Sequence, residues 1–345
     1  MDLTVMQQKI GLQSKGYFDR IKLFNIGGVN MFLLSPVFKD YIWGGNRLKT
    51  DFGFENDLEK TAEAWVLSCH KDGENTIASG KYSGRKLSEV LTDGMLGSDG
   101  TKFDFFPILI KLIDAKNNLS LQVHPDNEYA LKNENEYGKT ECWYILDCEK
   151  DSELIYGFKE DISPEEFRAS IENDTVLDRV NHVKVKKGDF FFIDSGTLHA
   201  IGKGILLAEI QQNSNTTYRV YDYNRLGNDG KPRPLHIDKA VDVTVCKKPV
   251  RSSSPEGEPE KYKGFEKTLL TSCDLFKVNL YKSKKSVSLF ADEKSFVSVL
   301  VIDGKGTIKN GDETLEIKKG DSVFIPASAG EIEIKGKIEF IETRV

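Results

Sequence analysis

The sequence lacks the features of disulfide-stabilised, membrane-spanning and nucleic-acid-binding proteins. Its five cysteines are odd in number and include no CxxC pair, which fits a reducing cytosol and argues against a zinc site built on cysteines. No stretch approaches the roughly 20 apolar residues that a membrane span needs. The net charge of −6 argues against a surface that follows nucleic-acid phosphates. We therefore expect a cytoplasmic protein with neither a membrane nor a nucleic acid as its partner.

The chain is long enough for two domains of ordinary size. Residues 1–30 contain neither a motif nor the continuous apolar core of a signal peptide, and we expect them to be an extension outside the fold. A new apolar run, MFLLSPVF, begins at Met31. The polar stretch KKPVRSSSPEGEPEKYKG, residues 247–264, has the composition of a linker. These boundaries predict a first domain over residues 31–246 and a second over residues 265–345.

A repeated motif predicts two copies of one β unit. KKGDFFFI at residues 186–193 returns as KKGDSVFI at residues 318–325, and each copy places a Gly-Asp turn before an apolar strand. Short strand-like segments separated by Gly, Asn and Asp turns fill most of the chain, which is typical of β-sandwiches and β-barrels. Helices are few. A capping box at Ser163 predicts a helix over residues 164–172, and SGRKLSEVL, PDNEYALKNE and HIDKAVDVTVC are further candidates.

Three segments of the first half supply four potential metal ligands. These are Gln122 and His124 in LSLQVHPD, Glu141 in GKTECW and His199 in DSGTLHAIG. In a strand, side chains two residues apart project to the same face, so Gln122 and His124 point the same way. Zinc accepts this mixture of nitrogen and oxygen donors, and a set that leaves room for water or substrate is typical of a catalytic site.

The second half lacks the corresponding ligand. His199 lies eleven residues after Gly188, whereas Glu331 occupies the same place after Gly320. We therefore expect one divalent metal ion per chain, bound in the first domain. For any single histidine an ordinary structural role is the alternative, and His70 and His182 are expected to be exposed.

Several motifs resemble known families. GDFFFIDSGTLHAIGK resembles the second motif of the cupin superfamily, although Asp194 replaces the usual proline and Lys203 a common asparagine. QVHP followed by GKTECW resembles the type I mannose-6-phosphate isomerases, particularly their short bacterial form. YIWGG, EAWVLSCH and QQNSNTTYRVYDYNR are also similar to this family, and the likeness spans nearly all of residues 35–345. The resemblance implies a mainly β protein with two cupin-type (jelly-roll) β-barrel domains and a few short helices.

The resemblance also implies an activity. It is the zinc-dependent interconversion of mannose 6-phosphate and fructose 6-phosphate through an enediol, on which negative charge develops at two oxygens. The family's metal ligands fall on Gln122, His124, Glu141 and His199, the same four residues that the strand pattern selects, and its active-site arginine falls on Arg219.

The resemblance further marks Lys111 and Ser120 as candidates for phosphate contact. Lys139 is predicted to share a strand face with the ligand Glu141, where its ammonium group contacts either the reacting oxygens or the phosphate. Glu209 is a candidate for proton transfer, provided that burial raises its pKa.

Two other functions fit parts of the pattern. Two histidines and one carboxylate also suit ferrous iron, which allows a cupin oxygenase. A metal-free carbohydrate-binding or storage cupin is the second alternative. Lys139 and Arg219 beside the ligands favour the isomerase, because an oxygenase has no general need to bind a dianion.

Removal of residues 1–30 tests the predicted boundary of the fold. A chain that begins at Met31 is expected to keep the melting temperature and the activity of the full-length protein, because the removed residues carry no motif. Thermal denaturation and an activity assay on both chains measure this. An insoluble or inactive shortened chain would show that the extension belongs to the fold.

Overall fold

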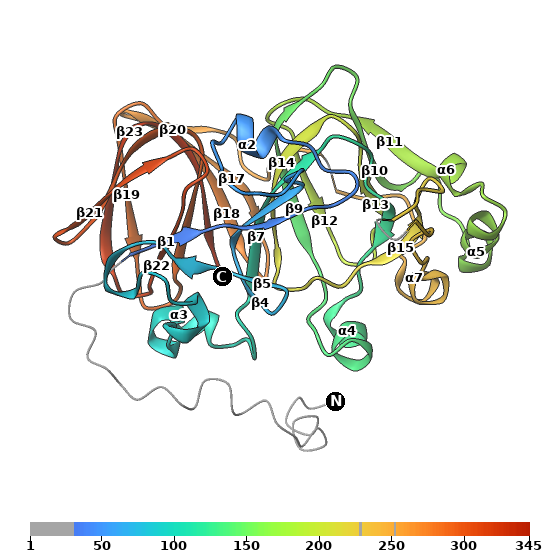
Figure 1. The fold of residues 1–345 in the computed structure, drawn as a ribbon, viewed down its shortest axis with the longest axis horizontal. Helices are drawn as coiled ribbons and strands as arrows, with labels where there is room; N and C mark the ends of the chain where they lie inside the picture. Colours follow the sequence, from blue (N-terminus) through green and yellow to red (C-terminus); the bar gives the residue numbers. More distant parts are fainter. Residues whose placement is uncertain (1–30, 228–229, 252) are drawn as a thin grey trace.

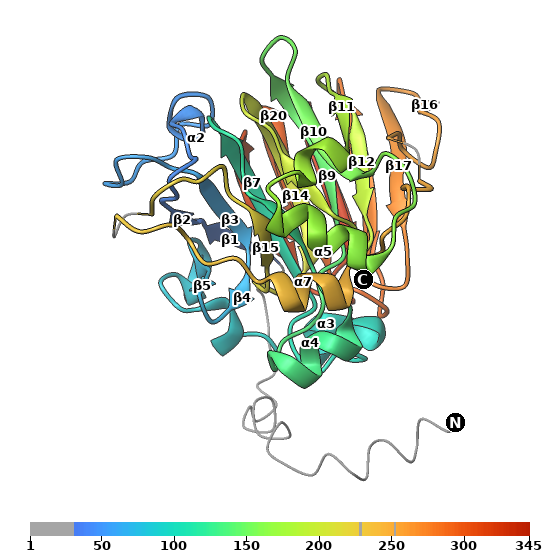
Figure 2. The ribbon, with the colours of Figure 1, turned by 90° about the vertical axis from the view of Figure 1, so that its right-hand side faces the viewer.

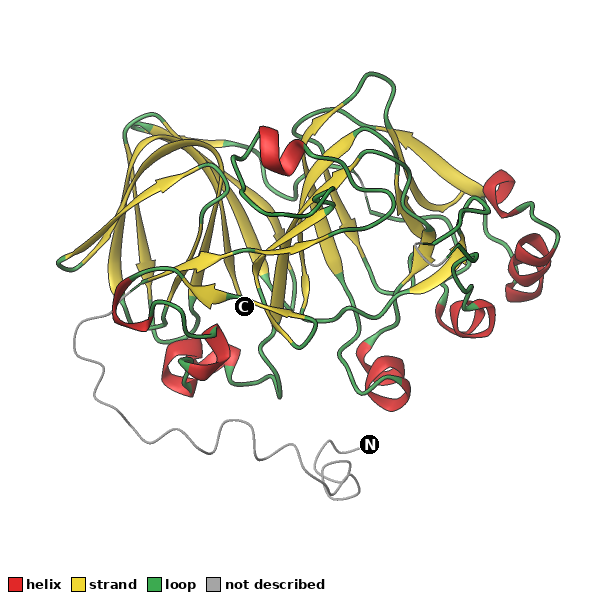
Figure 3. Cartoon of the chain, viewed as in Figure 1, coloured by secondary structure: helices red, strands yellow, loops and turns green. Residues whose placement is uncertain are grey.

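The computed structural model describes residues 31–227, 230–251 and 253–345, which are mainly β, as the sequence predicts (Figures 1 and 3). The predicted extension, residues 1–30, lies outside the described residues. Within the described ranges, no helix has both the length and the apolar character needed to cross a membrane. The short helices are α2 (Arg47–Thr50), η2 (Gly80–Tyr82), η3 (Leu87–Glu89), α3 (Asp93–Gly100), α4 (Asn127–Asn133), α5 (Pro164–Glu172), α6 (Val176–Arg179) and α7 (Ile237–Val243).

The first half of the chain forms two antiparallel sheets. The six-stranded sheet has the order β12 (Phe190–Ile193), β9 (Glu141–Cys148), β14 (Ile205–Gln212), β7 (Ile108–Ala115), β3 (Glu63–Leu67), β2 (Val37–Lys39). The five-stranded sheet has the order β11 (Val180–Lys184), β10 (Glu153–Phe158), β13 (His199–Ile201), β8 (Leu121–Val123), β15 (Tyr218–Tyr221). A small hairpin, β4 (Cys69–His70) with β5 (Gly73–Glu74), stands apart from both sheets.

A ten-stranded sheet contains the strands of the second half together with two from the first. Its order is β16 (Glu260–Tyr262), β17 (Phe265–Ser272), β18 (Lys277–Ser283), β23 (Gly330–Arg344), β20 (Val297–Asn310), β22 (Ser322–Ile325), β1 (Phe32–Ser35), β6 (Thr76–Ile77), with β19 (Ser286–Ala291) on β23 and β21 (Glu313–Lys318) on β20. The first described strand, β1, thus pairs with β22, and Phe32 lies opposite Phe324.

The sheets do not close into the β-barrels that the family resemblance implies. In every sheet the hydrogen-bonded order ends at two different strands. The six- and five-stranded sheets instead face each other across a shared core that includes Ile113, Trp143, Leu154 and Ile201. Face-to-face packing buries the apolar inner faces of both sheets, so the core forms without a continuous ring of hydrogen bonds.

The central strand β14 explains how the two halves hold together. All of its residues are buried, because both faces of the six-stranded sheet are covered. Ile205 and Leu207 point into the core between the two first-half sheets. Leu206 and Ala208 point the other way, into an apolar cluster that also contains Phe324 and other second-half side chains. The second half therefore covers the outer face of the sheet whose inner face lines the site.

Helices α5 and α7 cover the outer face of the five-stranded sheet (Figure 2), and α6 adds Val176 to the same apolar cluster. Helix α5 spans the residues that its capping box predicts, and the side chain of Ser163 accepts a hydrogen bond from the Glu166 amide at 3.1 Å. Helices α4 and α7 lie within two further predicted segments, whereas SGRKLSEVL forms only the single turn η3. Helix α3 was not predicted.

The repeated KKGD motif forms the same turn twice, as predicted. The Asp189 carboxylate accepts a hydrogen bond from the Lys186 amide at 2.9 Å, and the Asp321 carboxylate accepts one from the Lys318 amide at 2.8 Å. The glycine between them has a φ of 92° in the first copy and 96° in the second. Strands β12 and β22 follow these turns, so the sequence repeat is a structural repeat.

Alanine substitutions at the two turn glycines are expected to differ in cost. Both Gly188→Ala and Gly320→Ala place a β-carbon on a left-handed residue, which costs about 1–2 kcal/mol. At Gly320 that carbon also lies 2.8 Å from the Phe54 ring, whereas at Gly188 the nearest atom is 4.0 Å away. Urea denaturation should therefore rank Gly320→Ala as the more destabilising. Equal losses would contradict the role assigned to the Phe54 contact.

Candidate metal centre

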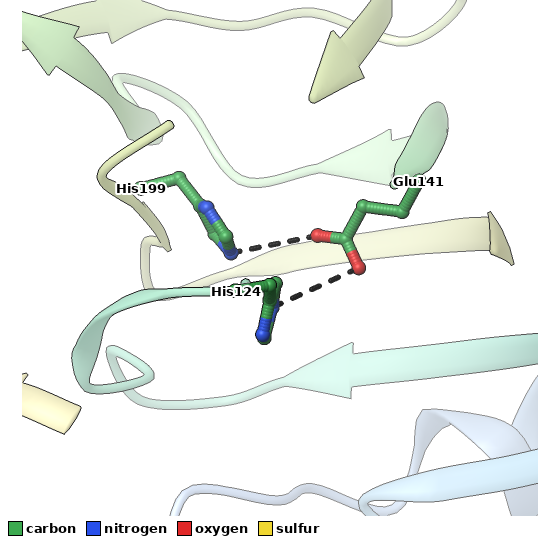
Figure 4. A group of neighbouring side chains, drawn as sticks. All are labelled: His124, Glu141 and His199. Atoms are coloured by element: carbon green, nitrogen blue, oxygen red, sulfur yellow. Dashed lines mark ion pairs between the residues drawn. The ribbon is translucent and has the colours of Figure 1, made fainter. Parts of the chain in front are cut away.

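Three predicted ligands meet where the two first-half sheets face each other (Figure 4). His124 directly follows β8, Glu141 opens β9, and His199 opens β13. Their ligand atoms lie within 4.8 Å of one another, with Glu141 carboxylate oxygens 3.9 Å from His124 Nε2 and 3.4 Å from His199 Nε2. All three side chains are buried. Among the residues that the structure describes, this is the only cluster of three or more His, Cys, Asp or Glu side chains suited to a metal ion.

Hydrogen bonds to backbone carbonyls orient the two imidazoles. His124 Nδ1 donates to the Thr216 carbonyl at 2.8 Å, and His199 Nδ1 donates to the Thr197 carbonyl at 2.8 Å. Each ring therefore keeps its proton on Nδ1 and turns the lone pair of Nε2 toward the cluster. Burial lowers the pKa of both histidines, to about 4 for His199, so both rings are neutral at pH 7 and able to bind a metal.

Unsatisfied buried atoms support a cation between these side chains. His124 Nε2 and Glu141 Oε1 are buried and have no hydrogen-bond partner. Such groups cost free energy unless they are compensated, and a metal ion compensates both donors. The residues present therefore fit a divalent cation.

The fourth predicted ligand, Gln122, lies beside this cluster. It is the register partner of His199 across β8 and β13, and its Nε2 lies 3.4 Å from His199 Nε2. Coordination through Oε1 requires the amide to turn by half a rotation. The structure thus brings all four predicted ligands together.

Lys139 lies next to Glu141, as predicted, although it precedes β9 (Glu141–Cys148) and does not share a strand with Glu141. Its ammonium nitrogen is 2.9 Å from Glu141 Oε2 and 3.6 Å from Glu209 Oε1. Burial raises the pKa of Glu141, and repulsion from the Glu209 carboxylate adds to this effect. A metal ion at the cluster opposes both effects, because it favours the carboxylate form.

Proton transfer by Glu209 was expected only if burial raised its pKa. In the structure the pKa of Glu209 is lowered instead. Burial by itself raises this pKa, but the ammonium groups of Lys139 and Lys111 outweigh it. Lys111 Nζ lies 3.2 Å from Glu209 Oε1, and Trp143 Nε1 donates to Glu209 Oε2 at 3.0 Å. Glu209 is therefore ionised and can accept a proton but has none to donate.

A pocket of about 270 Å³ adjoins the cluster and contains the other predicted site residues. Its lining includes Lys111, Ser120, Gln122, Lys139, Glu209 and Arg219. Arg219 is the register partner of Gln122, and its Nε is buried without a hydrogen-bond partner. Its Nη1 donates to the Pro234 carbonyl at 2.9 Å.

Sequence reasoning missed several pocket residues. Tyr41, Trp43, Glu63, Asn215, Thr217 and Arg233 also line the pocket. Arg233 Nε donates to the Asp222 carboxylate at 2.7 Å, so its guanidinium is held in place. No periodic pattern marks Arg233, because it lies in a loop. Asn215 and Thr217 lie in the family-like segment QQNSNTTYRVYDYNR, which offered the only signal for them.

One histidine prediction was wrong. His70 was expected at the surface, but only 5 % of its side chain is exposed. Its ring lies edge-on to Trp65, and its Nε2 is 3.5 Å from Glu136. Contacts from segments distant in the sequence bury it, and no local pattern reports them. His182 is exposed, as predicted.

Comparison with known proteins identifies the family. The family described as "Phosphomannose isomerase type I, catalytic domain" matches residues 31–158, and "Mannose-6-phosphate isomerase, cupin domain" matches residues 266–345. Mannose-6-phosphate isomerase ManA of Bacillus subtilis is 42 % identical over 89 % of this chain and 96 % of its own length. This chain belongs to the type I mannose-6-phosphate isomerase family.

Other proteins named as mannose-6-phosphate isomerases are similar to this chain in sequence, in fold or in both. A mannose-6-phosphate isomerase of Streptococcus mutans is 39 % identical over 90 % of this chain and 96 % of its own length. A crystal structure of the Bacillus subtilis mannose 6-phosphate isomerase superposes with a TM-score of 0.85 at 39 % identity, over 92 % of this chain and 100 % of that one. A putative mannosephosphate isomerase from Archaeoglobus fulgidus shares the fold, with a TM-score of 0.70 at 21 % identity, over 92 % of this chain and 99 % of that one.

For this member of the isomerase family, we expect one divalent ion per chain, in the first half. Glu141→Ala and His199→Ala each remove a donor and should abolish metal retention, whereas His182→Ala, at an exposed histidine, should retain the ion. Elemental analysis of protein purified without added metal measures all four chains. Two equivalents per chain, or full retention by either ligand variant, would contradict the assignment.

Proposed function

We propose that this protein is a zinc-dependent isomerase that interconverts mannose 6-phosphate and fructose 6-phosphate through an enediol. The observation that supports this most strongly is the buried His124–Glu141–His199 cluster beside a pocket lined by cationic side chains. Family membership supports the same reaction. Zinc suits the nitrogen and oxygen donors, with Gln122 as the fourth ligand.

The charges of the pocket suit a phosphorylated sugar. Lys111, Lys139, Arg219 and Arg233 all line it. Arg219 keeps a buried N–H without a partner, so its planar guanidinium is free to bind an oxygen of the substrate. Lys111 is already 3.2 Å from Glu209 and 3.8 Å from Glu63, so a phosphate bound there shares the ammonium group with two carboxylates. The Ser120 hydroxyl makes only a 3.4 Å contact with Gln122 and is available to the same phosphate.

The reaction moves a proton between C1 and C2 of the sugar while negative charge grows on two oxygens. A divalent cation held by Gln122, His124, Glu141 and His199 supplies Lewis-acid polarisation of those oxygens. Lys139 and Arg219 stabilise the same developing charge with donors that are already in place before the reaction. Glu209 is not assigned the proton transfer, because its lowered pKa makes it a weak base; its carboxylate accepts from the Trp143 indole N–H and instead lies between the ammonium groups of Lys111 and Lys139.

We also propose a division of labour between two cupin-type domains. Residues 31–246 carry every predicted ligand and catalytic side chain, and residues 265–345 form a domain without metal ligands. The predicted linker, residues 247–264, is only partly a linker, because Glu260–Tyr262 form β16 of the ten-stranded sheet, and β1 and β6 of the first half pair within that sheet too. Each domain is proposed to be a jelly roll that leaves its sheets open at the edges.

The five cysteines are all free, which supports the proposed cytoplasmic location.

A coupled assay tests the proposed activity directly. Zinc-loaded protein should convert mannose 6-phosphate to fructose 6-phosphate, and it should do so equally well without dioxygen, which an oxygenase requires. Chelator-treated protein should be inactive until zinc is returned. Failure of the zinc-loaded protein to turn over mannose 6-phosphate would contradict the proposal.

Arg219→Ala separates transition-state stabilisation from binding. Loss of a donor to the developing charge should lower kcat by about 10² to 10³, whereas zinc content should stay unchanged because Arg219 is not a ligand. Arg219→Lys should recover little activity, since a point charge does not reproduce the planar fork. Steady-state kinetics with zinc measured on the same samples decide this. A rise in KM alone would instead make Arg219 a phosphate clamp.

A further inference from the structure

The two metal-binding histidines are oriented in different ways. His199 donates to the carbonyl of Thr197, which lies two residues away in the same turn. His124 donates to the carbonyl of Thr216, which lies 92 residues away along the chain. Thr216 is part of the loop of residues 213–217, which joins β14 to β15. The orientation of His124 therefore depends on where this loop is held.

The Glu136 carboxylate holds the loop at Asn215 and Thr216. Glu136 Oε2 accepts hydrogen bonds from the Asn215 amide at 3.3 Å and from the Thr216 hydroxyl at 3.2 Å. The other oxygen of Glu136 lies 2.6 Å from Lys71 Nζ and 3.5 Å from His70 Nε2. Both partners belong to the β4–β5 hairpin and its turn, so Glu136 ties this hairpin to the loop.

The Glu136 carboxylate that links the hairpin to the loop is charged and partly shielded from solvent. The hydrogen bond from His70, opposed by burial and aided by Lys71, lowers the pKa of Glu136 to about 2. Its side chain is 15 % exposed. The hairpin also contacts the loop directly, because Asn215 Nδ2 donates to the Asp72 carboxylate at 2.9 Å. Ionised acceptors form stronger hydrogen bonds than neutral ones, so Glu136 is suited to fixing the backbone of residues 215 and 216.

We propose that Glu136 is a positioning residue for the metal centre, which acts on His124 through the Thr216 carbonyl. This inference rests on the metal site of the proposed function. Groups that orient a metal-binding histidine commonly change metal affinity by about 10- to 100-fold when they are removed. Asn215 and Thr217 line the substrate pocket, so the same carboxylate also fixes part of its wall.

Zinc affinity tests the proposal without substrate. The dissociation constant is measured by competition with a chromophoric chelator, well below the melting temperature of each chain. Glu136→Leu removes both loop contacts and should raise this constant by about 10- to 100-fold. Glu136→Gln keeps an oxygen that accepts from the loop and should stay within a few-fold of the parent protein.

Two further variants complete the test. Thr216→Val removes the hydroxyl contact but keeps the carbonyl, and it should raise the constant by about threefold to tenfold, the effect of one hydrogen bond. It also carries the test if Glu136→Leu does not fold. Glu153→Leu is the matched control, because Glu153 pairs with His182 at 2.7 Å and its neighbours on β10 lie opposite β11 and β13 rather than the loop. Its zinc affinity should equal that of the parent.

Two outcomes would overturn the proposal. The first is an unchanged zinc dissociation constant in Glu136→Leu or, where that variant does not fold, in Thr216→Val; a fall in melting temperature alone is what a merely structural role predicts. The second is an equal loss of zinc affinity in Glu153→Leu. A parent protein that binds zinc through this site but fails the mannose 6-phosphate assay would contradict the proposed function and leave the role of Glu136 intact.

Discussion

Three ionisable side chains, His124, Glu141 and His199, turn their ligand atoms toward one another in the core of a β protein. Burying such atoms without partners is costly, and a divalent cation bound between them offsets that cost. The rest of the site follows from this constraint. The chain must hold the three metal-ligand atoms within 4.8 Å of one another and must keep other ligands for the metal away from them. It must also balance the charge of neighbouring carboxylates, which Lys111 and Lys139 do.

Strand register meets the first requirement, and the second half of the chain helps to support it. Gln122 lies opposite both His199 and Arg219, while Glu141 lies opposite Ile193 and Gln211. A slip of one residue in any of these pairs would turn a ligand into the apolar core. The second half packs on the outer face of the same six-stranded sheet through the cluster around Phe324. The second half of the chain, which carries none of the predicted metal ligands, thus contributes to the metal site by fixing the sheet that carries Glu141 and Glu209.

Local patterns in the sequence predicted the features that depend on local geometry. Alternation along LSLQVH placed Gln122 and His124 on one face, the capping box placed helix α5, and the KKGD repeat placed two identical turns. Features that depend on contacts between distant segments were not predicted. His70 is buried by Glu136 and Trp65, and the pKa of Glu209 is set by two lysines from other segments. The open edges of the sheets likewise depend on pairing partners that composition and periodicity do not specify.

X-ray absorption spectroscopy at the zinc edge of the loaded protein reports directly on the atoms that bind the metal. Zinc held by His124, Glu141 and His199 should show only nitrogen and oxygen scatterers in the first coordination shell, at about 2.0–2.2 Å, with the multiple-scattering pattern of two imidazoles. A sulfur scatterer at about 2.3 Å, or a spectrum with fewer than two imidazoles, would contradict this set of ligands.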